Sequence, residues 1–182
     1  MIVSVEFCSK KEVQTIVPDP GTVLVSIVDP GDPPPVLSDR FLHVLRLEFH
    51  DLVGLPFNDF DEKVRGIYRM NGYIPERWVY FDRDHASILS GFILRMHRDP
   101  LPRSVLVHCY AGVSRSAAVA SVIADCAGVT LSRPVRHANV RVRSLILDEM
   151  FRIAPEILPS TKPCPEKTPP FLRRHRCAIP SI

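Results

Sequence analysis

Short apolar segments recur along the chain, and each ends at residues that favour turns. Residues 1–7 (MIVSVEF) and 41–51 (FLHVLRLEFHD) alternate apolar and polar positions, while residues 22–29 are rich in β-branched side chains and stop at the breaker DPGDPPP. Residues 104–109 (SVLVHC) form an uninterrupted apolar run after DPLPR. Alternation is typical of a half-buried strand, and a short continuous run is typical of a buried central strand. We therefore predict four strands.

A different period, close to 3.6 residues, occupies the segments between and after these strands. Residues 84–98 place their apolar side chains on one face, with Asp84 as the expected N-cap, and residues 114–128 end at Gly128, a suitable C-cap. From Pro134 onward a third segment repeats apolar positions at helical spacing, with arginines on its other face. Strands that alternate with helices predict an α/β fold with a central, mostly parallel sheet flanked by helices.

Two segments depart from this pattern. Residues 52–83 are long for a connection and carry scattered aromatic residues, which is typical of an insertion that forms a lid or has structure of its own. Residues 155–182 are rich in proline and lack periodicity, so we expect an extended or disordered tail. The predicted organisation is one domain over residues 1–154, with an insertion at 52–83, followed by the tail.

Composition narrows the class of protein. The chain has 182 residues, of which 46% are hydrophobic, which suits a single globular domain. Its five cysteines are an odd number without a Cys-x-x-Cys pair, so a disulfide framework or a zinc site is not expected. A net charge of +3 is too small to indicate nucleic-acid binding, and no apolar stretch is long enough to cross a bilayer. We expect a cytoplasmic monomer without metal or cofactor.

The stretch VHCYAGVSRSAAVA, residues 107–120, carries the strongest chemical pattern. Cys109 ends a predicted buried strand, Gly112 lies in a short loop, and a predicted helix follows with Arg115 in its first turn. A tight loop that closes on a helix N-terminus directs backbone N–H groups into one concavity, where the helix dipole favours an anion. The predicted anion-binding residues are Tyr110, Ala111, Gly112, Val113, Ser114 and Arg115.

Each side chain around this loop has a chemical interpretation. The same electrostatic field favours the thiolate form of Cys109, and the Arg115 guanidinium offers a two-pronged clamp for phosphate oxygens. His108 is placed to fix the loop, and Ser116 to donate a hydrogen bond to the sulfur. The alternative is a buried thiol that precedes a surface arginine by chance. The spacing alone would favour that alternative, but the strand, glycine and helix around it do not.

HCYAGVSRS resembles the His-Cys-x5-Arg-Ser loop of cysteine-dependent protein tyrosine phosphatases, particularly the small dual-specificity type and short bacterial tyrosine-phosphatase-like proteins. The similarity covers roughly residues 22–152. It implies a dual-specificity-phosphatase-like fold and two-step hydrolysis of a phosphorylated protein or peptide through a cysteinyl phosphate. Cys109, Arg115, Ser116 and His108 would form the catalytic set. Because the loop interior lacks lysine, unlike that of phosphoinositide phosphatases, phosphotyrosine is the favoured substrate, with phosphoserine and phosphothreonine left open.

The resemblance also implies an aspartate that acts as general acid, and here the sequence departs from the family pattern. Asp51 ends the strand at 41–51, the topologically matching place, but lies 58 residues before Cys109. Asp82 fits the linear spacing better, and Asp59 and Asp61 are weaker candidates. We favour Asp51, because the insertion accounts for the extra residues, and keep Asp82 as the alternative.

Two other classes of function also use a loop of this kind. A phosphopeptide-binding pseudophosphatase would keep the loop but lose turnover through a displaced acid. A rhodanese or an arsenate reductase would also use an anion-binding cysteine loop. Rhodanese loops are one residue shorter, and arsenate reductases of the low-molecular-weight phosphatase type carry the loop near the N-terminus, so neither matches this chain.

Overall fold

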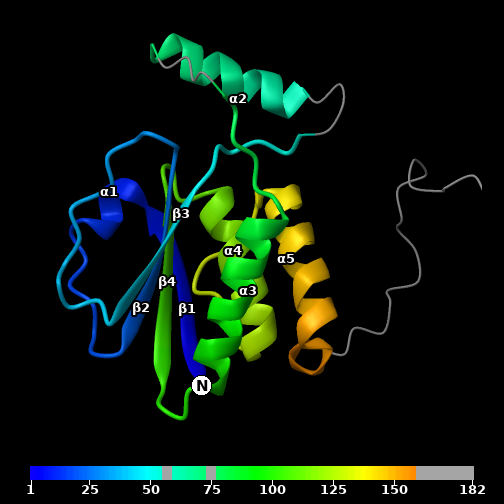
Figure 1. The fold of residues 1–182 in the computed structure, drawn as a ribbon. Helices are drawn as coiled ribbons and strands as arrows, with labels where there is room; N and C mark the ends of the chain where they lie inside the picture. The colour runs from blue at the N-terminus through cyan, green and yellow to red at the C-terminus, as the bar shows by residue number, and fades with distance from the viewer. Residues whose placement is uncertain (55–58, 73–76, 159–182) are drawn as a thin grey trace, which may run out of the picture.

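A four-stranded parallel sheet forms the centre of the protein (Figure 1). The structure is a computed structural model that describes residues 1–54, 59–72 and 77–158. The strands are β1 (Ile2–Ser9), β2 (Thr22–Val28), β3 (His43–Glu48) and β4 (Arg103–Cys109), and their order across the sheet is β1-β4-β2-β3. All three pairings are parallel, which confirms the predicted α/β class.

Three helices cover one face of the sheet: α3 (Arg83–Arg98), α4 (Arg115–Ala127) and α5 (Val140–Ile153). The short helix α1 (Lys10–Val13) lies on the other face. Helix α2 (Asp59–Met70), from the segment predicted as an insertion, stands at the end of the sheet where the strands terminate (Figure 1). A 3-10 turn, η1 (Pro155–Ile157), follows α5.

Alternation along the strands separates two hydrophobic clusters. Val23, Val25 and Ile27 of β2 face α3, α4 and α5 in the main cluster, whereas Leu24 faces the smaller cluster on the α1 side. Successive side chains of a strand point to opposite faces, so this division follows directly from the sequence. Strand β4 has the same pattern and lies between β1 and β2, which confirms its predicted central position in the sheet.

Several predicted boundaries need correction. Asp82, not Asp84, is the N-cap of α3: its side chain accepts a hydrogen bond from His85 N, and the His85 ring reaches back to Asp82 N. Helix α5 begins at Val140, not at Pro134, because the side chain of Asn139 caps it by accepting from Val142 N at 3.1 Å.

The predicted tail meets the described structure only at its beginning. Residues 155–157, which we expected to be extended or disordered, form the turn η1, and residues 159–182 lie outside the described residues. Within residues 1–54, 59–72 and 77–158, no helix combines the length and apolar character that a membrane span requires.

Candidate active site

Residues 110–114 connect β4 to α4 and form the predicted anion-binding loop. Gly112 has φ +70°, and a Cβ built there would lie 2.5 Å from Ser9 N and 2.6 Å from the carbonyl carbon of Cys8. The loop is also tied to the start of α1, where Lys10 N donates to Tyr110 O at 3.1 Å. Position 112 therefore requires glycine for its positive φ, as expected from the sequence, and also for the close approach of the end of β1, which the sequence did not predict.

Cys109 is buried on the α4 side of the sheet, and its Sγ lies 3.2 Å from Ser116 Oγ. This is the contact expected between the sulfur and the first turn of α4. Two other buried thiols differ in their surroundings: burial raises the pKa of Cys8 to about 12 and that of Cys126 to about 11. Those two thiols stay protonated near neutral pH, which is typical of structural cysteines.

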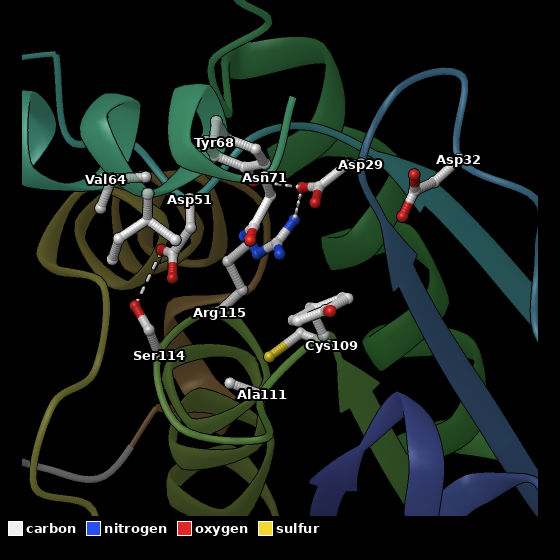
Figure 2. A pocket seen from close by; sticks show the side chains of 12 residues that line it. Asp29, Asp32, Asp51, Val64, Tyr68, Asn71, Cys109, Ala111, Ser114 and Arg115 are labelled. Carbon is white, nitrogen blue, oxygen red and sulfur yellow. Dashed lines mark hydrogen bonds and ion pairs between the residues drawn. The ribbon is translucent and has the colours of Figure 1, made fainter. Parts of the chain in front are cut away.

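Arg115 is only 2% exposed and points back across the loop toward the ends of β2 and β3 (Figure 2). Its Nη1 donates to Asp29 Oδ1 and to Phe49 O, both at 2.6 Å. Burial opposes the charge, but the acidic groups around the guanidinium, Asp29 first among them, together outweigh burial and raise the pKa of Arg115. The Nε atom is buried without a hydrogen-bond partner in the described part of the chain. An unpaired buried N–H is costly, so this edge of the guanidinium suits a bound anion.

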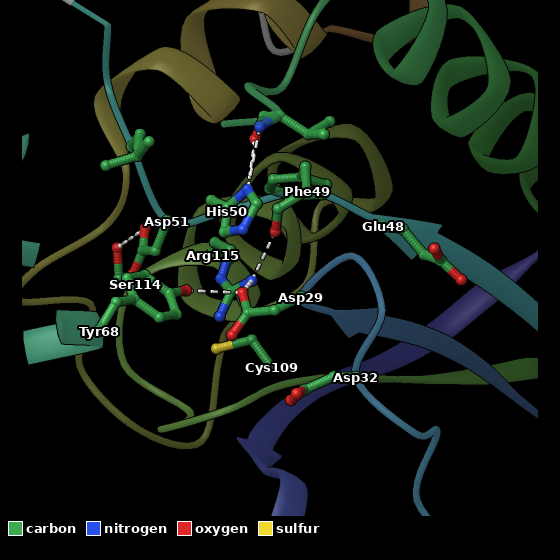
Figure 3. A network of polar contacts seen from close by, with 12 residues as sticks. Asp29, Asp32, Glu48, Phe49, His50, Asp51, Tyr68, Cys109, Ser114 and Arg115 are labelled. Atoms are coloured by element: carbon green, nitrogen blue, oxygen red, sulfur yellow. Dashed lines mark hydrogen bonds and ion pairs between the residues drawn. The ribbon is translucent and has the colours of Figure 1, made fainter. Parts of the chain in front are cut away.

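Asp29 directly follows β2 and binds more than the arginine. The same oxygen that accepts from Arg115 also accepts from the Tyr68 hydroxyl of α2 at 2.7 Å (Figure 3). Burial raises the pKa of Tyr68, so the phenol keeps its proton and acts as the donor. Asp29 thus joins α2 to the arginine of the loop.

Asp51 lies just beyond β3 and faces the loop from the opposite side of the site. Its Oδ1 accepts hydrogen bonds from Ser114 Oγ and from Asn139 Nδ2, each at 2.8 Å. Ser114 is the N-cap residue of α4 but makes no side-chain capping bond to that helix, since its hydroxyl is used by Asp51. Among the described residues, Oδ2 of Asp51 has no hydrogen-bond partner.

These groups line one pocket of about 400 Å³ (Figure 2). Its floor and side are formed by the loop residues Cys109, Tyr110, Ala111, Ser114 and Arg115. The ends of β2 and β3 contribute the carboxylates Asp29, Asp32 and Asp51, and α2 contributes Val64, Ile67, Tyr68 and Asn71. The pocket lies at the carboxyl end of a parallel sheet, where α/β folds generally bind ligands.

The remaining predicted residues lie outside the pocket lining. Gly112 and Val113 shape the loop without lining the pocket, and Ser116 reaches the site only through the sulfur. Asp82, the alternative acid, is used as the cap of α3. Although burial opposes it, the hydrogen bonds from His85 lower the pKa of Asp82. Asp61 is buried and binds backbone N–H groups of the preceding segment.

His108 has a different contact from the one expected. Its side chain points to the face opposite Cys109, and Nε2 lies 2.8 Å from Ser26 Oγ. The hydrogen bond therefore ties β4 to β2 and not to the loop, because alternate residues of a strand face opposite sides. Burial lowers the pKa of His108 to about 4, so the ring is neutral near pH 7.

Among the residues that hold Arg115 and Asp51 in place, Asp29 and Asn139 were not identified from the sequence, and Tyr68 was noted only as one of the scattered aromatic residues of the insertion. Asp29 had a usable pattern, since it immediately follows a buried strand of a predicted parallel sheet and would meet Cys109 at the same edge. Asn139 is a preferred N-cap type, which could have placed the start of α5 there. Tyr68 has no such local pattern, because its position depends on how α2 docks.

In the part of the chain that the structure describes, no group of three or more His, Cys, Asp or Glu side chains is arranged to hold a metal ion. No protein-family model matches the sequence, and no curated protein or solved structure matches the chain.

Proposed function

We propose that the protein is a phosphatase with a dual-specificity-phosphatase-like fold that hydrolyses phosphotyrosine in proteins or peptides, and phosphoserine or phosphothreonine where they fit. The observation that carries this proposal is the buried Nε of Arg115, which has no hydrogen-bond partner among the described residues, at a pocket that Cys109 also lines. A buried cation that Asp29 holds at Nη1, with Nε unsatisfied within the described part of the chain, suits an anionic ligand.

The first step transfers the phosphoryl group to the enzyme. The Cys109 thiolate attacks phosphorus, the bond from phosphorus to the ester oxygen breaks, and that oxygen takes a proton from Asp51. The products are the free hydroxyl compound and a cysteinyl phosphate. Arg115 and the N–H groups at the start of α4 hold the other phosphoryl oxygens.

The second step releases phosphate. The Asp51 carboxylate removes a proton from water as the water oxygen attacks phosphorus, and the bond from phosphorus to sulfur breaks. The sulfur leaves as a thiolate, which the Ser116 hydroxyl stabilises over the 3.2 Å contact. Asp51 lines the pocket and has one oxygen without a partner among the described residues, so it suits both proton transfers better than Asp82.

Hydrolysis of phosphotyrosine and 4-nitrophenyl phosphate in EDTA tests the proposal. We expect the wild type to turn over both substrates and Cys109→Ser to lose all measurable activity. Asp51→Asn should lose about 10²-fold on phosphotyrosine, whose leaving oxygen needs the proton, and less on 4-nitrophenyl phosphate, whose leaving group is weakly basic. Asp82→Asn is the matched control and should keep its rate.

Two results would change this assignment. A wild-type protein that binds vanadate or a phosphopeptide but gives no turnover would be a phosphopeptide-binding module and not an enzyme. If Asp51→Asn keeps its full rate while Asp82→Asn loses it, Asp82 is the general acid.

A further inference from the structure

Helix α2 is held over the pocket by contacts in its first turn and near its middle. Asp61 in its first turn accepts hydrogen bonds from Val53 N and Gly54 N, both at 2.7 Å. Farther along, Arg65 Nη2 donates to the Tyr80 hydroxyl at 2.7 Å. These bonds fix α2 to the segments on either side of it, without involving Cys109 or Arg115.

One further contact of α2 reaches the chemistry of the loop. Tyr68 donates to Asp29 Oδ1 at 2.7 Å, and Arg115 Nη1 donates to the same oxygen at 2.6 Å (Figure 3). Two donors on one oxygen fix the rotation of the carboxylate. Because Nη1 also donates to Phe49 O, the guanidinium is held at Nη1, while its Nε has no hydrogen-bond partner among the described residues.

We propose that Tyr68 is a positioning residue, which orients Asp29 and thereby directs the Nε edge of Arg115 toward the phosphoryl oxygens. This inference rests on the proposed function of the site. It gives α2, which lies outside the anion-binding loop, a part in phosphate binding through the orientation of Arg115. Without the Tyr68 hydroxyl, Asp29 Oδ1 keeps only the hydrogen bond from Arg115 among the described residues, so the carboxylate and the guanidinium that it holds are oriented less firmly.

The variant Tyr68→Phe removes the hydroxyl and keeps the ring, which packs against His50 and Trp78. An arginine that contacts phosphoryl oxygens binds both the substrate and the transition state, so its misplacement should raise KM more than it lowers kcat. We expect KM for phosphotyrosine and the inhibition constant for vanadate each to rise about tenfold, as is typical for a weakened charge-assisted hydrogen bond.

Tyr80→Phe is the matched control. It also removes one hydroxyl that holds α2, but this hydroxyl accepts from Arg65 and has no contact with Asp29. If Tyr68 acts only by docking α2, the two variants should show the same change. If it acts through Asp29, Tyr80→Phe should keep the wild-type KM and vanadate constant. Equal effects of the two variants, or no effect of Tyr68→Phe, would overturn the proposal.

A double-mutant cycle with Asp29→Ala tests the route. Tyr68→Phe should add no further loss of vanadate affinity in the Asp29→Ala background, whereas independent effects would multiply and contradict the proposal. Should Asp29→Ala fail to fold, the comparison of Tyr68→Phe with Tyr80→Phe decides alone. Calorimetric vanadate binding separates the two proposals: a wild type that binds vanadate without turnover overturns the enzyme assignment only. A wild type that does not bind vanadate overturns both.

Discussion

The buried His108 ring stays neutral in the folded protein, so the free energy of unfolding should depend on pH through this residue. Burial lowers its pKa to about 4, whereas an unfolded histidine titrates near 6.5. Between these values the unfolded chain binds a proton that the folded chain does not. The neutral His108 ring therefore makes its full contribution to the free energy of unfolding above about pH 6.5. This contribution is lost as the pH falls toward 4, and the loss is at most about 3 kcal/mol.

The variant His108→Gln isolates this contribution, because glutamine cannot titrate and places a polar atom near Ser26. Urea denaturation at pH 7 and pH 4.5 should show a smaller loss of unfolding free energy in His108→Gln than in the wild type. His50, whose pKa is also lowered by burial, is present in both proteins and cancels from the comparison. Equal losses in the two proteins would show that His108 is protonated in the folded state.

Gly112 makes a second prediction at the residue scale. In Gly112→Ala the new methyl group would meet the backbone of Ser9 and Cys8 at 2.5–2.6 Å, and the residue would keep an unfavourable positive φ. We expect a loss of at least about 1–3 kcal/mol in unfolding free energy, together with loss of phosphate binding as the loop shifts.

Gly91→Ala in α3 is the control for this substitution. A Cβ at Gly91 meets nothing within 4 Å, and alanine is the better helix former by about 1 kcal/mol. Gly91→Ala should therefore stabilise the protein while Gly112→Ala destabilises it, as measured by chemical denaturation. Destabilisation of similar size in both variants would contradict the steric explanation.

At the scale of elements, the sequence was informative wherever a structure is determined by neighbouring residues. Cys109, Gly112 and the start of α4 lie within seven consecutive positions, so the loop could be predicted as a unit. The contacts of Arg115 and Tyr68 with Asp29 could not be predicted, because tertiary packing of β2 and α2 brings these residues together. The shift from Asp84 to Asp82 at the start of α3 has a local cause, since either aspartate is an acceptable cap and only Asp82 has His85 three positions later.

The anchoring of α2 can be tested through Asp61, which is 3% exposed. Asp61→Ala would leave Val53 N and Gly54 N without their acceptor, at a cost of about 1–3 kcal/mol for the buried N–H of Val53 and less for that of the exposed Gly54. We expect faster hydrogen exchange in residues 59–70 and unchanged exchange in β4. Asp59→Ala, an exposed substitution in the same helical turn, should change α2 exchange only slightly. Unchanged exchange in Asp61→Ala would show that other contacts hold α2.

At the scale of the whole molecule, the pocket unites residues from β4, α4, α2 and the segments after β2 and β3. These parts are far apart in the sequence and converge only when the sheet is complete. A ligand that binds this pocket should therefore stabilise the entire fold and not one segment of it. The size of that effect depends on the ligand concentration relative to its dissociation constant, and is about 2.7 kcal/mol at a hundredfold excess.

Tungstate, a tetrahedral oxyanion, provides the measurement. Chemical denaturation with and without tungstate should give this increase in unfolding free energy for the wild type and none for Arg115→Met. Removing Arg115 leaves the buried Asp29 without its ion pair and destabilises the protein by itself, so the increments are compared and not the absolute values. Arg143 lies on α5 and pairs with Asp125 of α4 at the surface, so Arg143→Met should keep the full increase in unfolding free energy on tungstate binding. If Arg115→Met keeps it as well, the oxyanion binds outside the pocket, because no other guanidinium or ammonium group lines it among the described residues.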